Sequence, residues 1–117
     1  MTISTVLIAL IGLMHVYIFV LEMFLWDTPK GMRAFGNNAE QAEQTKKKKK
    51  NMGLYNGFLA AGLFWSLLAE PRVALANFFL GCVLIAGIYG GVTANKKIIY
   101  IQAIPALITL ILLNLGK

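Results

Sequence analysis

Four long apolar segments constrain the fold of this chain more than any other feature of its sequence. They span about residues 3–25, 52–69, 73–94 and 98–115. About 20 helical residues, rising ~1.5 Å each, cross a hydrocarbon layer of ~30 Å. Backbone groups in lipid must bond within a helix or a closed barrel, and these segments are too long for barrel strands. The sequence predicts an all-α integral membrane four-helix bundle, with residues 1–117 as a single membrane domain.

The polar section after the first segment carries signals for two helix starts. Thr28 can cap a short helix that has Pro29 at its first position and ends at Gly36. Asn38 and Gln41 then have the spacing of a capping box. A helix that begins there can continue through the lysines without a break. We therefore expect a helical cytoplasmic extension of the second span.

The distribution of basic residues predicts the orientation in the membrane. Most lysines and arginines lie in the loops at 26–51 and 95–97, and few lie elsewhere. The positive-inside rule therefore predicts a multi-pass protein of the cell (plasma) membrane, with both loops cytoplasmic and both termini outside. The net charge of +6 then reflects orientation, and nucleic acid is not an expected partner.

A run of five lysines next to the second span has two interpretations. It consists of Lys46, Lys47, Lys48, Lys49 and Lys50. In one interpretation it is a solvated collar that fixes the orientation. In the other it binds anionic lipid headgroups, at ~1 kcal/mol for each cation near the surface.

Polar residues within the apolar segments define a candidate site. His15 and Glu22 are seven residues apart and so lie on one helix face. Ionisable groups in a bilayer are costly and are candidates for function. Polar residues of the other three segments lie at about the same depth as Glu22. Together these residues predict a polar pocket near the cytoplasmic boundary, with His15 as its floor. The candidate ligand-binding residues are His15, Glu22, Tyr55, Asn56, Tyr89 and Gln102.

Structural roles for the same residues stay open. Glu22 can extend to the interface, and His15 can be a neutral imidazole bonded to the backbone or to another helix. Asn56 and Gln102 can simply cross-link helices. Two glycine pairs spaced for close helix packing predict tight contacts; they are Gly53 with Gly57 and Gly87 with Gly91.

Proline and cysteine in the last two segments receive structural interpretations. Pro105 removes one backbone hydrogen bond, so it should kink the fourth span and free the carbonyl of Ile101. Cys82 is the single cysteine, which excludes an internal disulfide and fits a packing role.

The chain carries no motif of a known enzyme class. It lacks a phosphate loop, HExxH, paired cysteines and GxSxG. One histidine and one buried glutamate are too few for a metal site, so we expect no metal and no cofactor. A membrane enzyme with His15 and Glu22 as base and acid is a third hypothesis, disfavoured by a separation of ~10 Å along the helix.

Several motifs resemble a family of small bacterial membrane proteins with four spans, the domain of unknown function 1304. The matching stretches run from His15 to Pro29, from Asn51 to Gly62, and over Gly87–Gly90 and Gln102–Ala106. The Gly-Leu-Tyr-Asn-Gly-Phe-Leu-Ala-Ala stretch within the second of these is the most specific. The chain departs from the family pattern in its unbroken lysine run and at Met52, where glutamine is expected. The resemblance implies a fold and shared polar positions, and it implies no activity.

Two functions follow from these features. The first, which the sequence favours slightly, is small-solute or proton-coupled transport or binding through the polar pocket. Glu22 would exchange a proton for a solute in a homo-oligomer, since four helices hardly enclose a pathway. The second is a non-catalytic membrane module that binds lipid or a partner protein.

Overall fold

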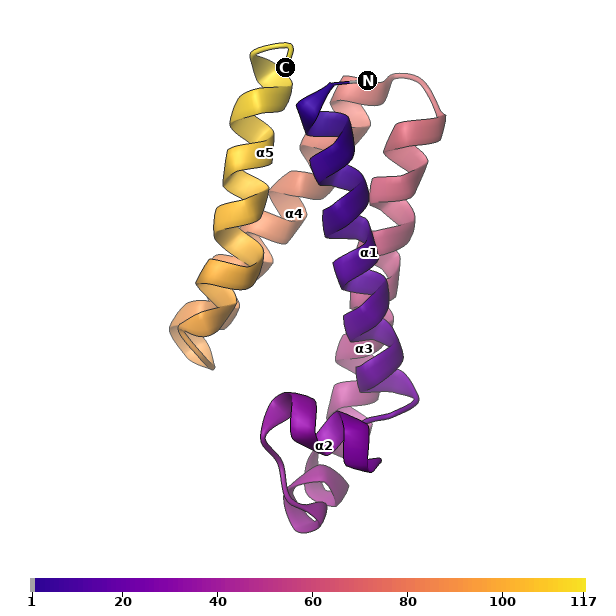
Figure 1. Ribbon diagram of the computed structural model, residues 1–117, viewed down its shortest axis with the longest axis vertical. Helices are drawn as coiled ribbons and strands as arrows, with labels where there is room; N and C mark the ends of the chain where they lie inside the picture. The colour runs from indigo at the N-terminus through magenta and orange to yellow at the C-terminus, as the bar shows by residue number, and fades with distance from the viewer. Residues whose placement is uncertain (1) are drawn as a thin grey trace. The chain divides into compact units, whose positions relative to one another are not determined.

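The computed structural model describes residues 2–117, and within that range it contains helices and no strand. The elements in chain order are α1 (Ile3–Met23), α2 (Pro29–Phe35), α3 (Ala39–Leu68), α4 (Arg72–Thr93), the π-helical turn η1 (Ile99–Ala103) and α5 (Ile104–Asn114) (Figure 1). The predicted all-α class is confirmed. The predicted helical extension of the second apolar segment is also present, because α3 runs without a break from the capping box through the lysines.

Two of the helices are long and apolar enough to cross a membrane. They are α1, with 21 residues, and α4, with 22 residues; Ile99–Asn114 is a shorter apolar stretch. Only 28% of the most apolar window of α1 and 22% of that of α4 is buried. A core helix of a soluble protein buries most of its apolar surface, so these exposed apolar faces favour a lipid environment.

Contacts divide the chain into two compact units. Unit 1 comprises Met1–Leu13 and Leu59–Lys117, and unit 2 comprises Met14–Phe58. The helices α1 and α3 each contribute to both units. Each unit is described by itself below.

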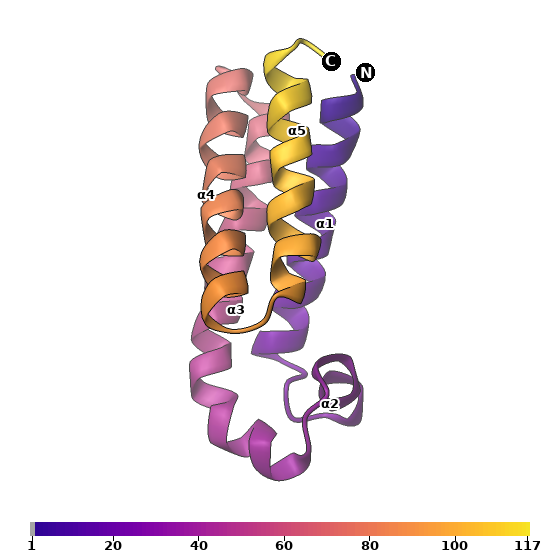
Figure 2. The ribbon, with the colours of Figure 1, turned by 90° about the vertical axis from the view of Figure 1, so that its left-hand side faces the viewer.

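Unit 1 packs four helical segments around one apolar core. Figure 2 shows four segments side by side: the first turns of α1, the last turns of α3, the whole of α4 and the whole of α5. Each segment contributes to the core, which consists of Ile8, Ile11, Leu63, Ala76, Leu80, Val83, Ala106 and Leu113. Both termini lie at one end of this unit (Figure 1), where the Ser4 N–H donates to the Lys117 carbonyl at 3.2 Å.

Glycines of α4 allow η1 to pack closely in unit 1. A Cβ atom at Gly87 would lie 2.6 Å from the backbone nitrogen of Ala103, and one at Gly91 would lie 2.1 Å from the side chain of Ile99. These distances are those expected of glycines at a close contact between helical segments. Both glycines are buried against η1, so neither is exposed for contact with a second copy of the chain.

The fourth apolar segment contains a π turn before its proline. The Ile104 N–H donates to the Ile99 carbonyl, which is an i to i+5 bond. Pro105 has no N–H and stands in the first turn of α5. The structure thus has a widened turn on the N-terminal side of Pro105, and the kink with a free Ile101 carbonyl stays a prediction.

Candidate functional site

Trp26 connects the end of α1 with the two other helices of unit 2. The residue is only 3% exposed. The indole N–H donates to the hydroxyl of Thr45 on α3 at 2.9 Å, and the ring centroid lies 4.6 Å from that of Phe35 on α2. A buried tryptophan commonly pairs its N–H in this way. The site is therefore built around one aromatic ring.

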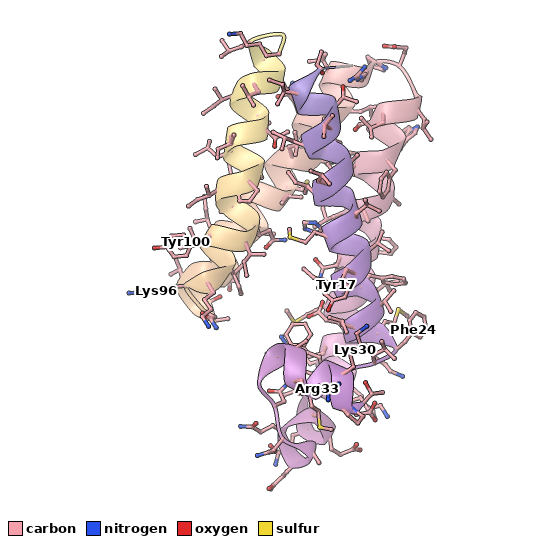
Figure 3. All side chains as sticks on the ribbon, in the orientation of Figure 1. Tyr17, Phe24, Lys30, Arg33, Lys96 and Tyr100 are labelled. Carbon is pink, nitrogen blue, oxygen red and sulfur yellow. The ribbon has the colours of Figure 1, made fainter. Side chains whose placement is uncertain are left out.

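The short helix α2 forms as the sequence predicts. The Thr28 side chain accepts a hydrogen bond from the Gly31 N–H at 3.3 Å, and Gly36 ends the helix with a φ of 69°. Gly31 also approaches the backbone, since a Cβ atom there would lie 1.9 Å from the Leu25 carbonyl oxygen. The basic side chains of Lys30 and Arg33 are both exposed on α2 (Figure 3).

The start of α3 is a reciprocal capping box. The Gln41 N–H donates to the Asn38 side-chain oxygen at 2.8 Å, and the Asn38 N–H donates to the Gln41 side-chain oxygen at 3.0 Å. The prediction is confirmed in both bonds. The box fixes where α3 begins and so which lysines face α1.

One face of α3 directs three of the five lysines toward the end of α1. Lys46 Nζ lies 3.0 Å from the Asp27 carboxylate. Lys49 Nζ lies 5.2 Å from the centre of the Trp26 ring and 4.0 Å from the Glu22 carboxylate. Lys50 lies on the same side, whereas Lys47 and Lys48 are exposed on the other faces of the helix. The run is therefore two sets of lysines, which we call the inner lysines (Lys46, Lys49 and Lys50) and the outer lysines (Lys47 and Lys48).

Glu22 and Asn56 form the polar contact between α1 and α3. The Asn56 amide donates to the Glu22 carboxylate at 2.6 Å, and the Glu22 side chain is only 5% exposed. Gly53 permits this approach, because a Cβ atom there would lie 2.9 Å from the Glu22 Cβ. Gly57 likewise packs against the ring of Phe19. Two of the predicted site residues, Glu22 and Asn56, are therefore in direct contact, beside two closely packed glycines.

The other predicted site residues are placed differently. His15 is fully buried in unit 2, whereas Tyr55, in the same unit, is 58% exposed and its ring meets the edge of Phe58. Tyr89, which is 71% exposed, and the half-buried Gln102 belong to unit 1. Within unit 2 the structure thus brings Glu22 and Asn56 together and leaves Tyr55 on the surface.

A shallow cavity lies beside the inner lysines. Its volume is about 160 Å³, and it is lined by Met23, Phe24, Trp26, Asp27, Lys46 and Lys50. Phe24 is 63% exposed and projects outward from the end of α1 (Figure 3). The cavity therefore combines two cations and one carboxylate with an apolar side.

Comparison with known proteins assigns a family. The family model described as "Protein of unknown function (DUF1304)" matches residues 9–114. The chain belongs to the DUF1304 family. It is also similar to "Uncharacterized protein YpaA" of Lactococcus lactis subsp. lactis (strain IL1403), with 31% identity over 115 residues, covering 95% of this chain and 97% of the relative. No solved structure matches the chain.

The DUF1304 match covers both units, and the residues around Trp26 are part of it. Sequence reasoning missed the roles of Trp26, Asp27 and Thr45 in this site. The spacing of Thr45, Lys46 and Lys49 places them on one helical face and was the available signal. Among residues 2–117, no group of three or more histidine, cysteine or acidic side chains could hold a metal ion.

The ion pair at the cavity predicts a pH dependence. The hydrogen bond from Lys46 holds the pKa of Asp27 below 3.8, its ordinary value, and the same contact raises the pKa of Lys46. Because the pKa of Asp27 is lowered by folding, its contribution to stability is present above pH 3.8 and is lost as pH falls through the lowered pKa.

We expect Trp26 fluorescence to report a small acid transition below pH 3.8 that is weaker in Asp27→Asn. Both side chains are more than a third exposed, so the effect should also shrink in high salt. An identical acid transition in the variant would show that another group is responsible. Glu40→Gln, at an exposed residue of α3, is the matched control.

Proposed function

We propose that this DUF1304 protein is a multi-pass protein of the cell membrane with four spans. The loops at 26–51 and 95–97 would face the cytoplasm and both termini would lie outside. The length and apolar surface of α1 and α4 support this proposal. Further support comes from the apolar second half of α3 and from Ile99–Asn114, and from the concentration of lysines at one side.

In this topology, unit 2 would act as a non-catalytic module that binds anionic lipid headgroups at the inner membrane surface. The observation that carries this proposal is the ordered arrangement of the inner lysines. Asp27 positions Lys46, and Trp26 and Glu22 position Lys49. A collar that only fixed orientation would need no such contacts. Lys30 and Arg33 on α2 add exposed positive charge to the same unit.

Charge magnitudes also favour binding over simple solvation. Each unpaired lysine close to an anionic membrane surface contributes ~1 kcal/mol. Because Asp27 and Glu22 offset two of the five charges, the run would contribute ~3 kcal/mol before screening by salt. That attraction is strong enough to select anionic lipids from a mixed bilayer. The apolar exposed ring of Phe24 can enter the acyl region beside them.

The lipid that copurifies with the protein tests this function. We expect protein extracted in mild detergent to carry phospholipid enriched in anionic species relative to the bulk membrane. Replacing all of Lys46–Lys50 by glutamine should abolish the enrichment, whereas Lys96→Gln with Lys97→Gln should preserve it. A wild-type lipid composition equal to that of the bulk membrane would refute the proposal.

A second candidate function is transport of a small solute coupled to proton movement. The observation that favours it is the buried Glu22 carboxylate, held by Asn56 within the proposed first span. Four helices hardly enclose a pathway, so this function requires a homo-oligomer. The glycine pairs of α3 and α4 pack within the chain, and an oligomer would therefore use other surfaces.

Flux measurements in liposomes test the transport function. With a pH gradient across the membrane, Glu22→Gln should reduce solute flux at least tenfold, because the amide cannot exchange a proton. Glutamine preserves the size of the side chain and an oxygen that accepts from Asn56. Unchanged flux in this variant, or no flux in the wild type for any polar solute tested, would exclude the mechanism.

A further inference from the structure

We propose that the cavity beside Trp26 is a specific site for one phosphodiester group that carries a single negative charge. Lys46 and Lys50 would bind its two non-bridging oxygens, and Met23 and Phe24 would contact its organic substituents. The inference deepens the proposed function and rests on it, because it takes unit 2 to lie at the membrane surface. The proposed function requires only a general attraction between the lysines and anionic lipid, whereas this inference assigns one lipid phosphate to one cavity.

The hydrogen-bonding capacity of the two lysines fits such a group. An ammonium has three N–H donors, and Asp27 occupies one of those of Lys46 at 3.0 Å. Lys50 forms no ion pair with any carboxylate of residues 2–117. Both side chains line the cavity and retain donors for an anion. Asp27 therefore fixes the position of Lys46 and leaves N–H donors of both lysines available to an anion.

The charge of the lining selects a monoanion. Lys46 and Lys50 contribute two positive charges, and Asp27 contributes one negative charge. A phosphodiester with one negative charge leaves the cavity neutral. A phosphomonoester carries more negative charge near neutral pH, and it would place that excess next to the Asp27 carboxylate. We therefore expect a preference for diesters over monoesters.

The size and the walls of the cavity fit a headgroup fragment. Its volume of about 160 Å³ is far above the ~10–15 Å³ of cavity volume that one water molecule needs. The Trp26 N–H is already bonded to Thr45, so its ring offers a wall and no donor. Met23 and the outward Phe24 provide an apolar side where the glycerol and the first acyl carbons of a lipid can rest.

The chain offers a matched pair of variants for the test. Lys46→Gln with Lys50→Gln removes the two lysines of the cavity. Lys47→Gln with Lys48→Gln removes the same charge from the same run, on the outer faces of α3. Lys50→Gln alone is a second variant, which leaves the ion pair between Lys46 and Asp27 intact.

Native mass spectrometry of the full-length protein in detergent, titrated with phosphatidylglycerol, gives the readout. We expect the wild type and the outer-lysine variant to bind one lipid with similar affinity. The cavity variant should bind at least tenfold more weakly, and Lys50→Gln severalfold more weakly. Phosphatidic acid, a monoester, should bind more weakly than phosphatidylglycerol.

The contrary outcomes are distinct. Equal losses in the cavity and outer-lysine variants, or tighter binding of phosphatidic acid, would overturn the specific site and leave the proposed function intact. Absence of any retained anionic lipid on the wild type would refute both. Competition by deacylated glycerophosphoglycerol as strong as that of the lipid would confirm the phosphodiester site and assign it to a soluble ligand instead of a headgroup.

Discussion

Replacing Gly31 with alanine is expected to destabilise unit 2 by at least ~3 kcal/mol. The added Cβ atom would lie 1.9 Å from the Leu25 carbonyl oxygen and 3.0 Å from that of Trp26. Both contacts are backbone atoms, so no side chain can rotate away to relieve them. Insertion into a packed site commonly costs ~1–3 kcal/mol, and a clash with rigid backbone belongs at the upper end or above it.

The measurement uses the buried indole of Trp26 as its reporter. In a Trp65→Phe background Trp26 is the remaining tryptophan, because the chain has two. We expect Gly31→Ala to shift Trp26 emission to longer wavelength and to lower the midpoint of chemical unfolding in detergent. Ala34→Ser, at an exposed position of α2, is the control and should leave both unchanged. Wild-type emission and stability in Gly31→Ala would show that α2 does not pack against the end of α1.

Replacing Gly87 with alanine is expected to destabilise unit 1 by ~2–3 kcal/mol. The Cβ atom would meet the backbone nitrogen of Ala103 at 2.6 Å and its Cα at 2.9 Å. The helix α4 and the turn η1 would have to separate, and the core around the fully buried Val83 would lose contacts. The cost follows from overpacking at a close contact between helices.

Gly81 of the same helix is the matched control. A Cβ atom there has no neighbour within 4 Å. Alanine at this position should therefore be neutral or stabilise the protein by up to ~1 kcal/mol, because it favours the helix over glycine. Thermal unfolding followed by circular dichroism in detergent compares the two variants. Equal stabilities for Gly81→Ala and Gly87→Ala would show that α4 and η1 are not in close contact.

Local signals in the sequence predicted the helical elements well. Thr28, Pro29 and Gly36 bound α2, and Asn38 with Gln41 starts α3. These predictions succeed because a cap bonds to backbone groups within four residues, so its chemistry is contained in a short stretch. The spacing of Gly53 and Gly57 is likewise a local signal, and a Cβ atom at Gly53 would lie 2.9 Å from the Glu22 Cβ.

The composition of the candidate site was harder to predict. The sequence presents the five lysines as one uniform run and does not separate the inner from the outer lysines. Which lysines face α1 depends on the residue at which the capping box starts α3. Trp26 is buried, and the residues that contact it follow it by up to 23 positions. Contacts at that separation depend on packing, and periodicity within one helix does not report them.

The π turn η1 has a consequence for chain length within the family. An i to i+5 bond accommodates one residue more than a regular α-helical turn, so η1 resembles a single-residue insertion that the helix has absorbed. Deleting Ile101 should therefore yield an uninterrupted α-helix leading into α5. Because one residue corresponds to ~100° of rotation, the same deletion would turn Lys96 and Lys97 to a different side relative to α5. Relatives that are one residue shorter here should retain the packing of α5 on α4 and differ in the direction of their basic turn.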